Sequence, residues 1–179
     1  MRYLSKNHHE QIKGFVGISL PFNVAEVIDR MGWIYQSFFL RTYTKYTILG
    51  HPIVKHWEDI GLLNFEKIKK SKTIREFHHH FTTKIYGFKD TDELLDRFLI
   101  SEEAISKFKY PAFLMIAKDD PIIPFNTIPT DSIRLNKNLK LLVTERGGHL
   151  CWFQGLRPKR WYPGPVFQFL EEIKNKEYM

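Results

Sequence analysis

The sequence lacks several features that mark whole classes of protein. Its 179 residues include one cysteine, Cys151, so no disulfide can form within the chain. A single cysteine favours an intracellular, reducing compartment but names none. No apolar run reaches the roughly 18 residues that a membrane-spanning helix needs, and the polar stretch before Gly14 lacks the apolar core of a signal peptide. We therefore expect no transmembrane segment in this chain.

The overall composition is that of an ordinary globular domain. Hydrophobic residues make up 43% of the chain and charged residues 26%, and the length suits one domain. The net charge is +7, and many basic residues lie in one run between residues 67 and 75. Because no stacking platform or groove-binding helix accompanies this charge, we expect no nucleic-acid partner.

Metal and thiol chemistry find little support in the sequence. The three consecutive histidines at 78–80 would point about 100° apart on a helix, so they cannot converge on one ion. No cluster of cysteines or carboxylates completes such a site, and we expect neither a metal nor another cofactor. Catalytic cysteines usually meet their histidine from a distant part of the chain. We therefore interpret Cys151, two positions after His149, as a small buried residue.

One stretch organises the chain. Residues 113–117, Phe-Leu-Met-Ile-Ala, are apolar without a break and lie between Pro111 and Pro121. An apolar run that short predicts a strand buried on both faces. An acidic pair, Asp119 and Asp120, follows its carboxyl end, where open α/β sheets bind their ligands.

Two further strands are predicted, one before and one after this stretch. Residues 15–19 precede a section of short helices, and residues 139–145 lead into a Gly-Gly-His loop that ends at His149. Helical connections between strands predict a parallel sheet. We therefore expect an α/β fold with flanking helices and three parallel strands, near residues 15–19, 113–117 and 140–144.

Two segments resemble the carboxyl-terminal half of the YheT-like, abhydrolase-domain-type α/β hydrolases, a family of esterases and lipases. The first is residues 117–124, Ala-Lys-Asp-Asp-Pro-Ile-Ile-Pro, and the second is residues 147–150, Gly-Gly-His-Leu. The resemblance implies that Asp120, third after Ala117, is the acid of a Ser–His–Asp triad. It implies that His149 is the general base, since the acid precedes the histidine in this fold.

Two more segments resemble the same family less specifically. Residues 19–23, Ser-Leu-Pro-Phe-Asn, resemble the segment after the strand that follows the nucleophile, although the family usually ends it with an acidic residue. Residues 76–88 resemble a cap-helix motif, with His78 and His79 where the family usually has aspartate. The resemblance implies a single partial hydrolase domain over residues 1–179, with a helical cap at about 40–108.

The nucleophile of this family is missing from the sequence. No G-x-S-x-G elbow is present, and the nearest approach, Gly-Ile-Ser-Leu-Pro at 17–21, has Pro21 where a small residue is needed. We interpret Ser19 as a strand-end serine. The chain then resembles a fragment or one half of a serine carboxylic-ester hydrolase, whose substrate is a lipid or small ester once an amino-terminal half completes it.

The alternative is a catalytically dead remnant that serves as a structural or interaction subunit of a larger assembly. Either interpretation leaves the strand at residues 15–19 with an unpaired edge. Because this strand carries no charge and no proline to protect that edge, we expect a protein partner or self-association.

Overall fold

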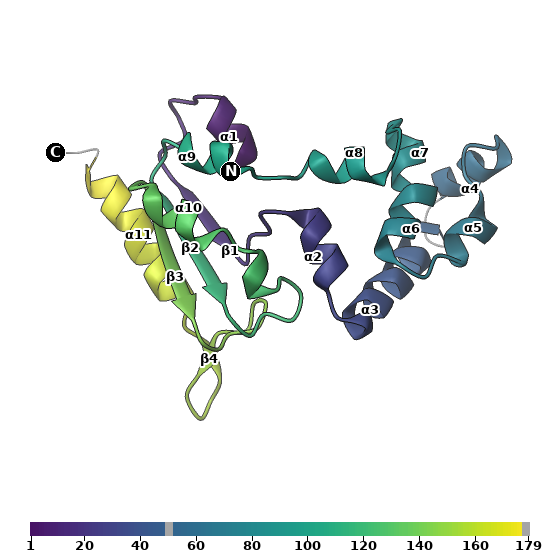
Figure 1. Ribbon diagram of the computed structural model, residues 1–179. Coiled ribbons are helices and arrows are strands. Elements are labelled where there is room, and N and C mark those ends of the chain that lie inside the picture. Colours follow the sequence, from purple (N-terminus) through teal and green to yellow (C-terminus); the bar gives the residue numbers. More distant parts are fainter. Residues whose placement is uncertain (49–51, 177–179) are drawn as a thin grey trace. The chain divides into compact units, whose positions relative to one another are not determined.

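The computed structural model describes residues 1–48 and 52–176, and the chain folds as two compact units (Figure 1). The sheet unit combines Met1–Asn23 with Leu99–Met179, and the helical unit is Val24–Phe98. The expectation of a single domain with a cap at about 40–108 stays a prediction. Within the described residues, no helix is both long enough and apolar enough to cross a membrane.

The sheet unit is built on three parallel strands in the order β1-β2-β3. They are β1 (Phe15–Ile18), β2 (Ala112–Ala117) and β3 (Leu139–Thr144). All six residues of the central strand β2 are buried, as its unbroken apolar run predicts. The predicted parallel α/β arrangement is confirmed, with boundaries within one residue of the expected ones.

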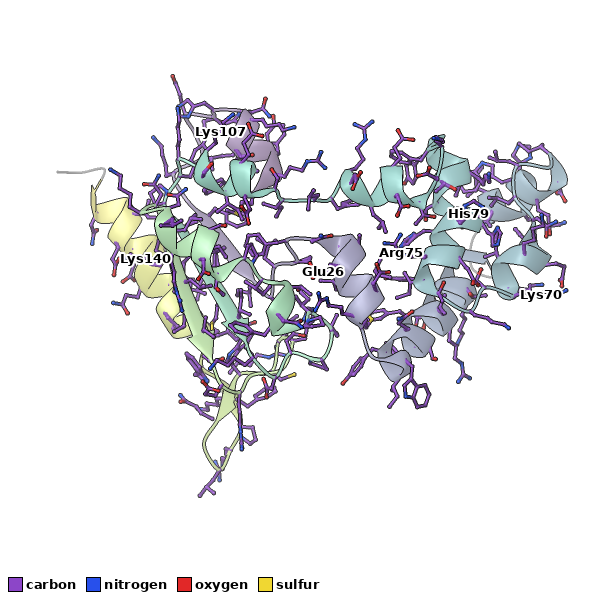
Figure 2. The ribbon with its side chains drawn as sticks, viewed as in Figure 1. Glu26, Lys70, Arg75, His79, Lys107 and Lys140 are labelled. Carbon is purple, nitrogen blue, oxygen red and sulfur yellow. The ribbon has the colours of Figure 1, made fainter. Side chains whose placement is uncertain are left out.

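Alternate residues of β2 face opposite sides of the sheet. Phe113, Met115 and Ala117 pack on one side with the buried indole of Trp152 and with Phe169. Phe169 belongs to α11 (Pro163–Lys176), the long helix that runs beside β3 in Figure 1. An ion pair between Lys140 of β3, labelled in Figure 2, and Glu172 of α11 (2.7 Å) adds a polar contact between the same two elements.

The other helices of the sheet unit are short. Asn136 joins two of them, because its side-chain amide donates to the carbonyl oxygens of Ile105 (2.7 Å) and Phe108 (2.9 Å). The helix expected between the second and third strands is split into a 3₁₀ turn and an α-helix by Pro129. These elements are α1 (Arg2–Lys6), α9 (Glu102–Ser106), η2 (Phe125–Thr127) and α10 (Thr130–Leu135).

The helical unit consists of short helices. Three begin at a side-chain cap. In two of these, at positions where the sequence predicts a capping box, Thr73 and Asp90 accept from the amides of Glu76 and Glu93. Apolar residues at helical spacing from Val24 predict one helix as far as residue 38 or 39, but the structure has two, with Gly32 as the N-cap of the second. The sequence also predicts a helix at 51–60, whose first residue lies outside the described residues. The elements are α2 (Val24–Arg30), α3 (Trp33–Tyr43), η1 (Thr44–Ile48), α4 (Pro52–Asp59), α5 (Phe65–Lys69), α6 (Ile74–His80), α7 (Thr82–Tyr86) and α8 (Thr91–Asp96).

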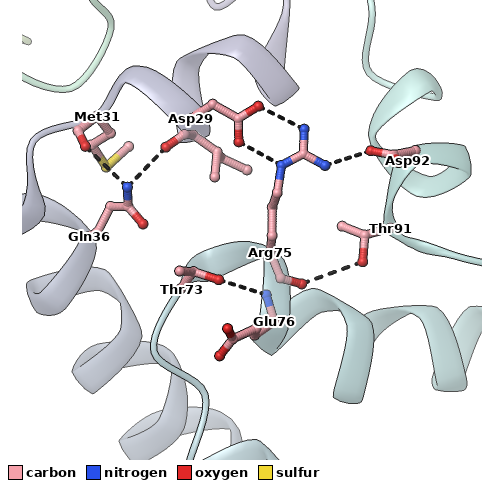
Figure 3. A network of polar contacts seen from close by, with 9 residues as sticks. Asp29, Met31, Gln36, Thr73, Arg75, Glu76, Thr91 and Asp92 are labelled. Atoms are coloured by element: carbon pink, nitrogen blue, oxygen red, sulfur yellow. Dashed lines mark hydrogen bonds and ion pairs between the residues drawn. The ribbon is translucent and has the colours of Figure 1, made fainter.

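Arg75 ties three helices of this unit together (Figure 3). From α6 it donates through Nε and Nη2 to both oxygens of Asp29 in α2 (2.6 and 2.9 Å), and through Nη1 to Asp92 in α8 (2.5 Å). The hydrogen bonds to Asp29 and then Asp92 raise the pKa of the Arg75 guanidinium. The same unit has an apolar core that includes Ile68 and Phe77.

Two features after His149 differ from the sequence analysis. A short antiparallel hairpin, β4 (Phe153–Gln154) and β5 (Lys159–Arg160), was not predicted because each strand has two residues, too few to show an alternating pattern. Cys151 is exposed, so its interpretation as a buried residue is wrong. The neighbouring Trp152 takes the inward position instead, and the larger apolar side chain fills the core.

Candidate active site

The acidic pair leaves β2 at its carboxyl end, and its two side chains have different surroundings. Asp120 is buried, whereas Asp119 is exposed. The turn into Pro121 directs Asp120 inward, where its Oδ1 accepts from the amides of Ile122 (2.8 Å) and Ile123 (2.9 Å). These two hydrogen bonds satisfy one oxygen of a carboxylate that burial removes from water.

His149 lies in the loop after β3, and its imidazole meets this acid. Nδ1 of His149 is 2.9 Å from Oδ2 of Asp120. The Asp120 side chain has no exposed surface, while that of His149 is 32% exposed. An ionised carboxylate only accepts hydrogen bonds, so toward such a partner Nδ1 is the ring nitrogen that donates. The predicted approach of these two side chains is therefore observed.

The two glycines before His149 allow the loop to turn against the core. A Cβ on Gly147 would lie 2.2 Å from Nε1 of Trp152, so only glycine fits over the indole. Gly148 has a φ of +55°, a left-handed conformation that glycine adopts without strain. Trp152 is itself held by a hydrogen bond from Nε1 to the hydroxyl of Thr144 (2.8 Å), at the end of β3.

Asp119 and Ser19 also contact this loop, and sequence reasoning assigned neither of them a part in the site. Oδ1 of Asp119 accepts from the amides of Gly147 and Gly148, both at 2.8 Å. Ser19, at the end of β1, is buried and donates its hydroxyl to the backbone carbonyl of His149. The available signal in the sequence was the pair of adjacent acidic residues directly after β2.

Other polar clusters offer no comparable chemistry. Among the described residues, no group of three or more histidine, cysteine or acidic side chains could hold a metal ion. His78 has its Nδ1 2.9 Å from the hydroxyl of Thr82, and burial lowers the pKa of its imidazole. A cavity of about 700 Å³ lies beside Asn138, at the amino end of β3, whereas Asp120 and His149 lie at the carboxyl ends of the strands.

Comparison with known proteins finds relatives that are similar to this chain over part of their length. No family model matches the chain. The monoacylglycerol lipase of Saccharomyces cerevisiae is 34% identical over 104 residues, which are 58% of this chain and 23% of that protein. The mouse phospholipase ABHD3 is 25% identical over 155 residues, covering 85% of this chain and 36% of that protein. The Escherichia coli protein YheT is 29% identical over 110 residues, or 60% of this chain and 32% of that protein.

The chain is similar to part of the YheT-like, abhydrolase-type α/β hydrolases. The predicted resemblance is confirmed, and the three-stranded parallel sheet with its helices is part of an α/β-hydrolase fold. The chain spans between 23% and 36% of the length of the three relatives named above. The similarity is therefore to part of a lipase- or esterase-type hydrolase.

Proposed function

We propose that this chain supplies the acid and the general base of a serine hydrolase that cleaves carboxylic esters of the acylglycerol or phospholipid kind. The observation that carries the proposal is the 2.9 Å contact between His149 Nδ1 and the buried carboxylate of Asp120. The names of two relatives, a monoacylglycerol lipase and a phospholipase, support the substrate class.

In this mechanism the two side chains have separate tasks. Nε2 of His149 takes the proton of a serine hydroxyl as its oxygen attacks the ester carbonyl, and later returns that proton to the leaving alcohol. The Asp120 carboxylate keeps Nδ1 as the donor and stabilises the imidazolium that forms. The serine and the oxyanion-hole amides come from a segment outside this sequence, because the sequence contains no G-x-S-x-G elbow.

We also propose that both units belong to one partial hydrolase domain, in which the helical unit is the cap. The helical unit is inserted in the sequence between β1 and β2. An insertion of helices between two sheet strands is where α/β hydrolases carry a lid, which supports this assignment.

Complementation tests the catalytic proposal. The full chain is co-expressed with the amino-terminal segment of YheT, and the purified complex is assayed with a short-chain nitrophenyl ester and a monoacylglycerol. We expect hydrolysis by the complex and none by either part alone. Asp120→Asn removes the charge that orients the imidazole and should lower kcat by about 10⁴-fold, and His149→Gln at least as much.

The matched control is Glu145→Gln, an exposed carboxylate near the end of β3 that pairs with Lys118. This variant should keep the activity of the wild-type complex. An assembled complex that hydrolyses neither ester, or one that works equally well with His149→Gln, would contradict the proposal.

A non-catalytic role as an interaction subunit is the second candidate, and one observation favours it. The Ser19 hydroxyl, the one nearest to an elbow position in the sequence, donates to the His149 backbone carbonyl. We therefore expect no labelling of the isolated chain by a fluorophosphonate probe. Labelling of wild type that disappears in Ser19→Ala would show that this serine is a nucleophile and would rule out the non-catalytic role.

A further inference from the structure

We propose that Asp119 and Ser19 are positioning residues that hold the main chain on the two sides of the His149 imidazole. The inference rests on the proposed function of His149 as the general base. Asp120 contacts only the ring nitrogen of that histidine. The direction in which Nε2 points depends also on the backbone that carries the ring, and Asp119 and Ser19 contact that backbone.

Asp119 holds the amino-terminal side of His149. Its Oδ1 accepts two consecutive amides, Gly147 N and Gly148 N, each at 2.8 Å. Consecutive amides that converge in a turn form a concavity that binds anions, and a carboxylate in it makes charge-assisted hydrogen bonds. The fit requires a glycine conformation, since Gly148 has a φ of +55°. Asp119 is exposed, so the position is open to substitution without creating a core cavity.

Ser19 holds the carboxyl-terminal side. It is 5% exposed, and its hydroxyl donates to the His149 carbonyl, 130 positions later in the sequence. Among the described residues it is the non-glycine residue with a positive φ, +48°. Such a conformation costs free energy and persists where the surroundings hold it, often at functional sites. Its amide also donates to Met115 (2.9 Å), so β2 anchors the residue that contacts the loop.

Through Ser19 and Asp119, the residues that follow β1 and β2 both bond the backbone of the loop that carries His149. Asp119 and Asp120 are adjacent, so a single turn after β2 supplies the bond to the ring and the bonds to the preceding backbone. Ser19 supplies the bond after the ring from the neighbouring strand. Loss of either backbone contact should let the imidazole rotate away from Asp120 while the sheet stays folded.

The experiment for Asp119 is nitrogen-15 NMR of the full chain with labelled histidine. The His149 signals are assigned by their loss in His149→Gln, and their shifts report which ring nitrogen carries the proton. In Asp119→Ala we expect the Nδ1 proton to exchange about tenfold faster than in wild type, with a smaller fraction of the Nδ1–H tautomer. Asp119→Asn keeps one acceptor oxygen and should lie between the two.

Glu145→Gln is the matched control, because it removes a nearby exposed carboxylate that pairs with Lys118. It should leave the His149 signals unchanged. If Asp119→Ala fails to fold, as judged by the signals of the other seven histidines, Asp119→Asn provides the measurement. Signals in Asp119→Ala or Asp119→Asn that match those of wild type would overturn the role of Asp119.

For Ser19, two substitutions separate the hydroxyl from the backbone conformation. Ser19→Gly removes the hydroxyl and tolerates the positive φ, whereas Ser19→Ala removes the hydroxyl and keeps the strain. We expect faster Nδ1 proton exchange in both variants. Ser106→Ala is the control, since Ser106 also donates its hydroxyl to a carbonyl oxygen, that of Glu103 (2.9 Å). Unchanged exchange in Ser19→Gly would overturn the role of the hydroxyl.

The same spectra separate this inference from the proposed function. A wild-type spectrum without an Nδ1–H signal for His149 would contradict the Asp120–His149 pair and therefore the proposed function. A wild-type signal that survives unchanged in the Asp119 and Ser19 variants would contradict only the positioning inference.

Discussion

Gly147 shows how closely the histidine loop packs on the sheet unit. A Cβ added there would lie 2.2 Å from Trp152 Nε1 and 2.5 Å from Cε2. Trp152 is 1% exposed and donates to the Thr144 hydroxyl, so the indole cannot move aside without losing that hydrogen bond and its packing. The loop that carries His149 therefore packs directly against the buried side chain of Trp152.

We predict that Gly147→Ala destabilises the chain by about 1–3 kcal/mol, because the added methyl group overpacks a well-filled region. The free energy of unfolding is measured by urea denaturation with tryptophan fluorescence. Gly164→Ala is the control, since Gly164 is helical and a Cβ there meets nothing within 4 Å. The prediction is wrong if Gly147→Ala is as stable as Gly164→Ala.

At the scale of secondary-structure elements, the ion pairs of Arg75 connect three helices of the helical unit. The helices α2, α6 and α8 are six or seven residues long, too short to be stable alone. One guanidinium of α6 bonds a carboxylate from each of the other two. Its planar fork binds both oxygens of Asp29, which the single ammonium of a lysine cannot reproduce.

We predict that Arg75→Lys lowers the stability of the helical unit by about 1 kcal/mol, because partly exposed, charge-assisted hydrogen bonds contribute modestly. Thermal unfolding followed by circular dichroism measures the effect. Arg30→Lys is the matched control, since Arg30 pairs with Glu26 within one exposed helix and should change little. Equal melting temperatures for the two variants would show that the three-helix network adds nothing.

At the scale of the whole molecule, the sheet has an open edge. Among the described strands, only β2 pairs with β1. The amides of Phe15 and Ser19 donate to carbonyl oxygens of Pro111 and Met115, both at 2.9 Å. The amides between them alternate in direction, so Val16 and Ile18 direct theirs to the other edge. Unpaired edges of this kind favour pairing with another chain.

We predict that the isolated chain associates through this edge, with itself or with a protein partner. Light scattering at several concentrations should give a mass that rises with concentration. In dilute solution, hydrogen exchange should be faster at Val16 and Ile18 than at Phe15 and Ser19, and addition of the YheT amino-terminal segment should slow it. A concentration-independent monomer with all four amides protected would show that another part of this chain covers the edge.

The sequence by itself determined the sheet and the two residues, Asp120 and His149, that meet in the candidate site. The β2 run was recognisable because a strand buried on both faces must be apolar throughout, and Asp120 and His149 were recognisable because short motifs at strand ends mark them. Helix starts such as Thr73 were also predictable, since a capping side chain bonds within three residues. All of these signals are local in the chain.

Only the tertiary structure decided which residues hold the pair in place. The contact from Ser19 to His149 crosses 130 positions, and the contacts from Asp119 to Gly147 and Gly148 cross 28 and 29. The same is true of Cys151, whose exposure depends on Trp152 occupying the core beside it. Hydrogen bonds and packing between segments this far apart exist only once the sheet has brought the strand ends together, so no local pattern could have indicated them.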